Sequence, residues 1–117
     1  MLLPLVQQVK AQQLTGFWYS PDSTRIYEIT MRSPDEYSGI IRSSTRKTDS
    51  VGFEVIRKLK YNKRKKRFEG FIYSTEDNSV AFVKIRFNKP DPDKIILSLS
   101  RMFVFNVAFN WRRAVLT

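Results

Sequence analysis

Apolar and polar residues alternate with a period of two along almost the whole of this 117-residue chain. Such alternation turns one face of an extended segment towards a core and the other towards solvent, and it therefore indicates β-strands. Groups of Pro, Asp, Asn and Ser separate the alternating segments and are typical of turns. The segments that we predict to be strands are residues 14–20, 24–32, 37–43, 53–61, 67–74, 80–87, 94–100 and 102–113.

Two tryptophan motifs stand at opposite ends of this pattern. A Gly-x-Trp motif ends at Trp18, and a Trp-Arg-Arg motif ends at Arg113. When an even-numbered antiparallel meander closes on itself, its last strand lies beside its first, so the two motifs would meet. We predict an all-β, eight-stranded, antiparallel up-and-down barrel that follows a short N-terminal turn or helix. The residues expected to close it, with Arg113 across the indole of Trp18, are Gly16, Trp18, Trp111 and Arg113.

Five motifs also carry a resemblance to a known group of proteins. They are Gly16-Phe17-Trp18, Ile26-Tyr27-Glu28-Ile29, Ser38-Gly39-Ile40-Ile41, Phe68-Glu69-Gly70-Phe71-Ile72-Tyr73 and Trp111-Arg112-Arg113. In this order the chain resembles the calycin superfamily, which includes lipocalins and fatty-acid-binding proteins. It is most similar to a family of small exported bacterial lipocalin-like proteins of uncharacterised function. The resemblance covers about residues 14–113 and implies a lipocalin-like barrel and export, but no known activity.

The composition limits the chemistry that the chain can perform. It contains neither cysteine nor histidine, and so lacks thiol nucleophiles, the usual zinc ligands and the commonest general acid and base. We expect no catalytic residue, metal site or cofactor, and a protein that is not an enzyme. A carboxylate-based activity is the remaining enzymatic alternative, but the spacing of Glu28, Glu69, Asp91 and Asp93 places no two carboxyl groups across a cleft.

The N-terminal residues leave the location of the protein open between two readings. Residues 1–6 are apolar, and Val9-Lys10-Ala11 resembles a signal-peptidase site, although no positive segment precedes it. We expect residues 1–13 to be a signal remnant or an N-terminal cap, and residues 14–117 to form a single barrel domain. Export to the periplasm or cell envelope of a bacterium is the expected location, with the cytoplasm as the alternative. No stretch approaches the ~20 apolar residues of a membrane-spanning helix.

Large aromatic residues occupy positions that could face the barrel interior. An eight-stranded barrel either fills its interior with side chains or holds one small ligand. The size of the candidate inward residues favours a filled interior, and a ligand cavity is the alternative. The residues expected to line such a cavity are Tyr27, Phe82, Phe87, Phe103, Phe105 and Phe109.

A basic cluster lies between the predicted fourth and fifth strands. Residues 57–67 contain eight Lys and Arg and no acid, in a chain whose net charge is +10. The candidate anion-binding residues are Lys63, Arg64, Lys65, Lys66 and Arg67. Tyr61 and Phe68 flank the turn and could stack on a base or insert among headgroups. The simpler interpretation is a solvated loop that keeps a sheet edge soluble.

These features lead to two function hypotheses. The first is a binding protein for a small hydrophobic or amphipathic molecule, or a cell-envelope component, whose headgroup could be anionic if basic residues around Arg64 form the rim. The second is a filled barrel whose basic hairpin binds an acidic partner or an anionic membrane surface. Sequence-specific nucleic-acid binding is not expected, because no recognised DNA- or RNA-binding motif is present.

Overall fold

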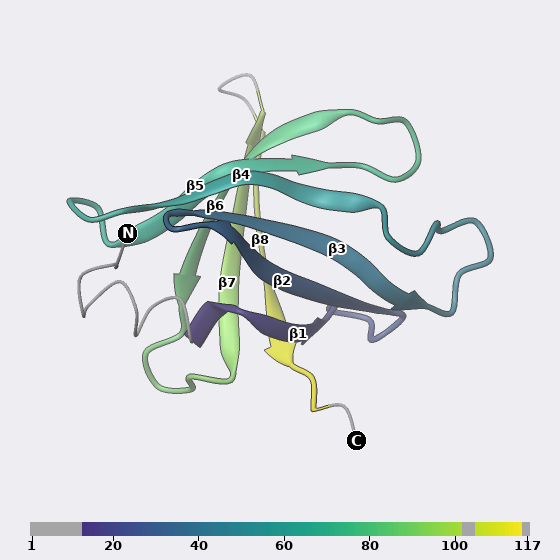
Figure 1. The fold of residues 1–117 in the computed structure, drawn as a ribbon, viewed down its shortest axis with the longest axis horizontal. Helices are drawn as coiled ribbons and strands as arrows, with labels where there is room; N and C mark the ends of the chain where they lie inside the picture. The colour runs from purple at the N-terminus through teal and green to yellow at the C-terminus, as the bar shows by residue number, and fades with distance from the viewer. Residues whose placement is uncertain (1–12, 102–104, 116–117) are drawn as a thin grey trace.

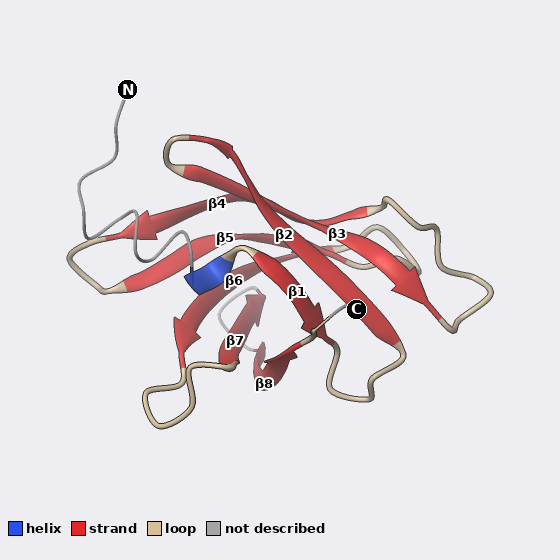
Figure 2. Ribbon diagram, turned by 60° about the horizontal axis from the view of Figure 1, so that its bottom comes forward, coloured by secondary structure: helices blue, strands red, loops and turns tan. Residues whose placement is uncertain are grey.

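The computed structural model describes residues 13–101 and 105–115 of the chain. Figure 1 shows its eight strands wound around a common interior. The strands are β1 (Gly16–Tyr19), β2 (Arg25–Ser33), β3 (Glu36–Ser44), β4 (Glu54–Asn62), β5 (Arg67–Tyr73), β6 (Val80–Phe87), β7 (Lys94–Arg101) and β8 (Phe105–Arg113). Residues 13–14 form the end of a helical turn before β1 (Figure 2). Most of the candidate signal remnant lies outside the described residues.

Each strand pairs antiparallel with the strand that follows it, and β1 also pairs with β8. The sheet is therefore a closed barrel with the strands in sequence order. This confirms the predicted all-β, up-and-down, eight-stranded fold. The predicted strand boundaries agree to within about three residues, because the alternation of buried and exposed positions defines each strand.

The seam between β1 and β8 is short, and side chains extend it. Trp18 is paired with Arg113, and Tyr19 with Arg112. The guanidinium of Arg113 lies 4.0 Å from the ring centre of Trp18. It also donates to the carbonyl oxygens of Thr15, at 3.0 Å, and of Gln13. Arg113 therefore joins the last strand to both the first strand and the residues that precede it.

Gly16 makes room for this arginine. Its φ angle is +123°, a conformation that residues with a Cβ rarely adopt. A Cβ at this position would lie 3.0 Å from Nη1 of Arg113. The Gly-x-Trp motif thus supplies a gap for the guanidinium and, two residues later, the ring on which it stacks.

The two ends of the barrel differ in how they are filled. The end with the β2–β3, β4–β5 and β6–β7 turns is closed, and Phe68 lies at its centre with 1% of its surface exposed. Tyr37, Tyr61 and Phe87 surround Phe68, with ring centres 4.9–6.0 Å away and edge-to-face geometry. The opposite end carries the β1–β2, β3–β4 and β5–β6 loops, and we call it the mouth.

A bulge in β4 brings two backbones close together. The four residues of β4 from Arg57 to Lys60 face three residues of β5, from Phe71 to Glu69, and Lys58 has a φ of 55°. Gly70 of β5 lies against this bulge. A Cβ there would be 2.8 Å from the Cα of Leu59 and 3.0 Å from the carbonyl oxygen of Arg57. The bulge also explains why Arg57 interrupts the apolar face predicted for residues 53–61.

The seam predicts a large loss of stability when Arg113 is changed to Met. The substitution removes the stack on Trp18 and two hydrogen bonds to carbonyl groups, and should cost about 2–3 kcal/mol of unfolding free energy. Urea denaturation measures this loss. Arg112→Met is the matched control: Arg112 also contacts the first strands, with its guanidinium 4.7 Å from the ring centre of Tyr19 and a hydrogen bond to Ser23 Oγ, but these contacts are exposed to solvent. Its loss should therefore cost less than about 1 kcal/mol of unfolding free energy. Equal losses for the two variants would show that Arg113 does not secure the seam.

The bulge predicts that Gly70→Ala is more destabilising than Gly39→Ala. Backbone atoms of β4 block the new methyl group at position 70, so the strands must separate, at a cost of about 2–3 kcal/mol. At position 39 the nearest atom is Ile56 Cβ, at 3.2 Å, so the overlap is milder and a smaller displacement of the neighbouring strand relieves it. Urea midpoints of the two variants test this order, and the reverse order would contradict it.

Candidate ligand-binding cavity

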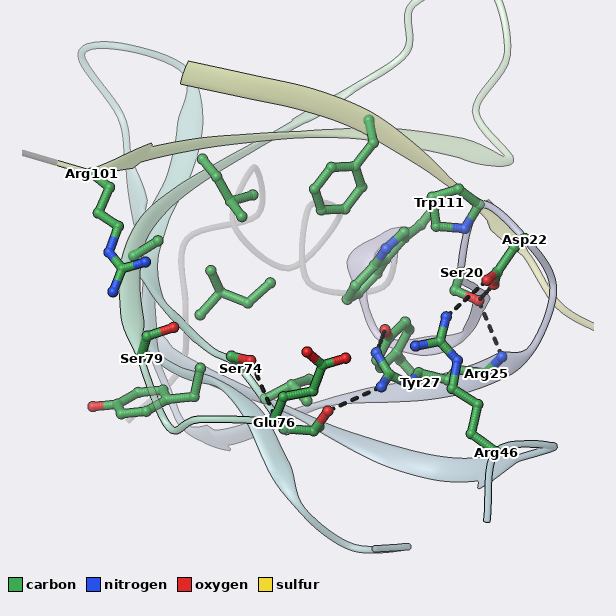
Figure 3. Close-up of a pocket in the computed structure, with 18 residues that line it drawn as sticks. Ser20, Asp22, Arg25, Tyr27, Arg46, Ser74, Glu76, Ser79, Arg101 and Trp111 are labelled. Atoms are coloured by element: carbon green, nitrogen blue, oxygen red, sulfur yellow. Dashed lines mark hydrogen bonds and ion pairs between the residues drawn. The ribbon is translucent and has the colours of Figure 1, made fainter. Parts of the chain in front are cut away.

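The mouth half of the barrel contains a cavity of about 540 Å³. Its walls are mainly apolar, and its opening is surrounded by polar and charged side chains (Figure 3). The apolar lining residues are Val55, Ile72, Ala81, Leu99 and Phe109, with Tyr27 and Trp111. The interior is therefore filled at the closed end and hollow at the mouth, so neither interpretation offered by the sequence describes the whole barrel.

Tyr27 and Trp111 form a rigid aromatic surface beside the cavity. Their rings are stacked in parallel, with centres 4.0 Å apart and planes 11° from each other. Both residues are buried in the core and also line the cavity. The other tryptophan, Trp18, has no exposed surface and does not line the cavity. A ligand that enters the barrel would thus contact one of the two indoles and not the other.

Arg25 organises one side of the mouth. It donates from Nε and Nη2 to the two carboxylate oxygens of Asp49, at 2.6 and 2.8 Å, and from Nη2 to Thr75 Oγ1 at 3.0 Å. The hydroxyl of Tyr27 lies 3.4 Å from Nη1. Arg25 therefore ties the β3–β4 loop and the β5–β6 loop to β2. We call Arg25, Tyr27, Asp49 and Thr75 the Arg25 network.

The Arg25 network fixes the ionisation of its members. Asp49 has only 1% of its side chain exposed. The hydrogen bonds from Arg25, joined by one from Ser44, lower the pKa of Asp49 from 3.8 to about 2. The same pair raises the pKa of Arg25 further above its usual value. Burial raises the pKa of the Tyr27 phenol, so this hydroxyl stays protonated and can donate a hydrogen bond.

The other charges at the mouth largely balance each other. Arg46 donates to Asp22 at 2.8 Å, and hydrogen bonds from Thr24 and Ser20 keep the pKa of Asp22 well below its usual value. Glu76 and Arg101 also line the opening. The charged residues that line the opening, taken with Asp49, are therefore three arginines and three carboxylates, and their charges balance.

The structure places the expected cavity residues in different surroundings. Tyr27 and Phe109 line the cavity. Phe82 is not among the lining residues and contacts Phe71, which is 40% exposed, and the amine of Lys84. Phe87 packs against Phe68 in the closed half. Phe103 lies outside the described residues, and Phe105 is described only as the first residue of β8.

The basic cluster does not form the rim of the cavity, contrary to the expectation for residues around Arg64. Strand β5 leads from the β4–β5 turn to the loop at the mouth, so the two lie at opposite ends of the barrel (Figure 1). Arg67 is paired with Glu69 at 2.6 Å. Phe68 is buried, so its ring cannot stack on a base. Lys63, Arg64, Lys65 and Lys66 are exposed.

Several cavity residues were not singled out from the sequence. The clearest is Arg25, which stands at the start of β2 on the same face as the buried residues Tyr27 and Ile29. A cation on an inward-facing position is a signal that could have been recognised. Ala81 begins the inward face of β6 and leaves space where its neighbours Val83 and Ile85 fill the core.

No protein-family model, curated protein or solved structure matches this chain. The likeness to lipocalins therefore rests on the motifs and on the closed eight-stranded barrel. Within the described residues, no helix is sufficiently long and apolar to span a bilayer. The same part of the chain holds no cluster of three or more potential metal-ligating Asp or Glu residues.

The Arg25 network predicts a specific acid sensitivity. Because the pKa of Asp49 is lower in the folded protein than its value of 3.8 elsewhere, its ion pair stabilises the fold above about pH 4. This stabilisation should disappear as the pH falls towards about 2. Asp49→Asn should lower the free energy of unfolding by about 2–3 kcal/mol at neutral pH, and by much less near pH 2. Urea denaturation of wild type and of the variant at a series of pH values between neutral pH and about pH 2 measures this difference.

Asp35→Asn is the control for this experiment. Asp35 is exposed in the β2–β3 turn, and it makes no hydrogen bond or ion pair with another described side chain. Its replacement should leave the pH dependence of stability unchanged. If Asp49→Asn and Asp35→Asn gave parallel curves, the network would not control stability at the mouth.

Proposed function

We propose that this protein is a lipocalin-like binding protein that holds one small molecule in the mouth half of its barrel. The observation that carries this proposal is the cavity of about 540 Å³. Sites for small molecules usually measure about 300–1,000 Å³ and combine apolar walls with a few fixed polar groups. The apolar walls would provide affinity, and the Arg25 network would orient the polar end of the ligand.

The balance of charge at the mouth bears on the ligand class. Arg25 and Arg46 are already bound to Asp49 and Asp22, so neither presents a free cation. We propose an apolar body with an uncharged or zwitterionic polar end, in place of the anionic headgroup that the sequence suggested. The polar end would lie near the Tyr27 hydroxyl and Thr75 Oγ1, which face each other across the guanidinium of Arg25.

A non-enzymatic role is part of this proposal. The carboxylates considered from the sequence lie on the outside and have cationic neighbours: Glu28 with Arg42, Glu69 with Arg67, Asp91 with Lys94, and Asp93 with Arg113. At the mouth, hydrogen bonds hold Asp22 in its ionised form, which is unsuited to a general acid. This arrangement supports binding in preference to carboxylate chemistry.

We also propose that the chain belongs with the small exported lipocalin-like proteins, and that it acts in the periplasm or cell envelope. The order of its motifs and its up-and-down barrel support the first part. The second part depends on the N-terminal sequence, since residues 1–12 lie outside the described residues. Fractionation of the native host with an antibody to the barrel would test the location.

Filling the cavity should abolish binding. Ala81→Trp places a large ring inside the mouth half, whereas Val80→Trp adds the same ring at the adjacent position, which is 41% exposed. We expect the neutral fluorescent probe N-phenyl-1-naphthylamine to bind wild type and Val80→Trp alike. Ala81→Trp should bind it about tenfold more weakly or worse.

The tryptophans provide a second readout. Direct contact with the bound probe should shift the emission maximum of Trp111 and leave that of Trp18 unchanged, because only Trp111 lines the cavity; single Trp→Phe variants separate the two signals. Native mass spectrometry of protein purified from its own host should then identify the natural molecule. If Val80→Trp and Ala81→Trp bound the probe equally well, or if wild type did not bind it, the proposal would be refuted.

A further inference from the structure

A second surface, at the opposite end of the barrel, has a composition that the cavity does not explain. Lys63, Arg64, Lys65 and Lys66 form the β4–β5 turn and are all exposed; we call these four residues the basic tip. The tip projects at the end of the β4–β5 hairpin (Figure 1). None of its four side chains forms an ion pair within the described part of the chain, so their charges face water uncompensated.

The carboxylate closest in sequence to the tip, Glu69, is engaged by other residues. Glu69 accepts from Arg67 at 2.6 Å and from Asn62 at 3.2 Å. The hydrogen bond from Arg67 is the main cause of the lowered pKa of Glu69. Glu54 is bound to Arg32 at 2.9 Å and lies 3.4 Å from Arg57. Arg57 and Arg67, at the two ends of the cluster, are therefore paired, whereas Lys58, Lys60 and the four residues of the tip form no ion pair within the described part of the chain.

Protection of a sheet edge does not account for this charge. Cations commonly occur on edge strands, where they prevent pairing with another molecule. In this closed barrel β4 pairs with β3 and β5, and β5 pairs with β4 and β6. Neither strand of the hairpin has a free edge. Four adjacent like charges repel one another, so an anionic partner is the physical reason for keeping them together.

The surroundings of the tip indicate which kind of anionic partner fits. Single-stranded nucleic acid is usually held by exposed aromatic rings on which bases stack. Here Phe68 is buried, and the half-buried ring of Tyr61, which packs against Phe68 with centres 4.9 Å apart, is the one aromatic ring among the described residues that line an open groove beside the tip. This groove measures about 590 Å³; three lysines, Lys58, Lys60 and Lys63, line it together with Tyr61, Asn62 and Glu69, whose carboxylate is held by Arg67. A projecting cationic turn with a lysine-lined groove fits the headgroups of a flat anionic bilayer.

We propose that the basic tip docks this protein on an anionic phospholipid surface. The contact is electrostatic and reversible, because no large apolar side chain belongs to the tip. It also sets an orientation. Since the tip and the mouth lie at opposite ends of the barrel, a docked molecule would hold its cavity open towards water, and lipid binding and ligand binding would be independent of each other.

Vesicle cosedimentation tests this proposal. Wild type should bind vesicles of phosphatidylcholine mixed with phosphatidylglycerol, and its binding should fall steeply with added salt. Pure phosphatidylcholine vesicles should bind little. Replacing Lys63, Arg64, Lys65 and Lys66 with glutamine lowers the net charge from +10 to +6 and should weaken binding about 100-fold or more.

A charge-matched control separates the tip from net charge alone. Replacing Arg42, Lys47, Lys84 and Arg101 with glutamine also lowers the net charge from +10 to +6, and three of these residues lie towards the mouth. We expect this variant to lose only a few-fold in affinity. Equal losses in the two variants would overturn the proposal, as would strong binding to pure phosphatidylcholine.

Two further measurements keep the outcome decisive. DNA oligonucleotide and additional anionic vesicles can be compared as competitors for wild type that is bound to vesicles, with the concentration of each expressed as phosphate. If the DNA competed at the lower phosphate concentration, nucleic acid would replace lipid as the partner, and the proposal would fail. Ala81→Trp should bind vesicles as wild type does, because its substitution is confined to the mouth half. Loss of vesicle binding in that variant would contradict the independence of the two sites. The salt dependence of wild type remains informative even if a multiple variant does not fold.

Discussion

The contact between the first and last strands is the constraint on which the rest of this structure depends. Within the described residues, two residue pairs join β1 to β8, and Arg113 adds its stack on Trp18 and its bonds to the carbonyl groups of Thr15 and Gln13. Closure removes both sheet edges and creates an inside and an outside. Without it, β1 and β8 would each have a free edge, and the cavity would be an open surface.

The distribution of side-chain size along the barrel produces a filled half and a hollow half. At the closed end, Tyr37, Tyr61 and Phe87 pack around Phe68. At the mouth, the inward position of β6 is occupied by Ala81, and the opposite walls are aliphatic. The Tyr27–Trp111 stack lies beside the hollow part. One barrel can in this way combine a rigid core with space for a ligand.

Charge is also separated between the two ends. At the mouth Arg25 and Arg46 are paired with Asp49 and Asp22, and the Arg25 network uses its pair to hold two loops in place. The β4–β5 turn carries four cations with no matching carboxylate. These are different uses of the same residue types: ion pairs at the mouth determine shape, whereas the uncompensated charge attracts anionic surfaces over a distance of about a Debye length.

The sequence by itself determined the barrel, because a period of two is a local property and the turn residues mark where each strand ends. It also determined that the Gly-x-Trp and Trp-Arg-Arg motifs could meet, since an even number of antiparallel strands brings the chain ends together. Only the tertiary structure decided that Phe82 faces outward while Tyr27 and Phe109 line a cavity, and that Arg64 lies far from the mouth. The physical reason is that cavity shape and the pairing of Arg25 with Asp49 depend on register and bulges across many strands, which no short stretch of sequence specifies.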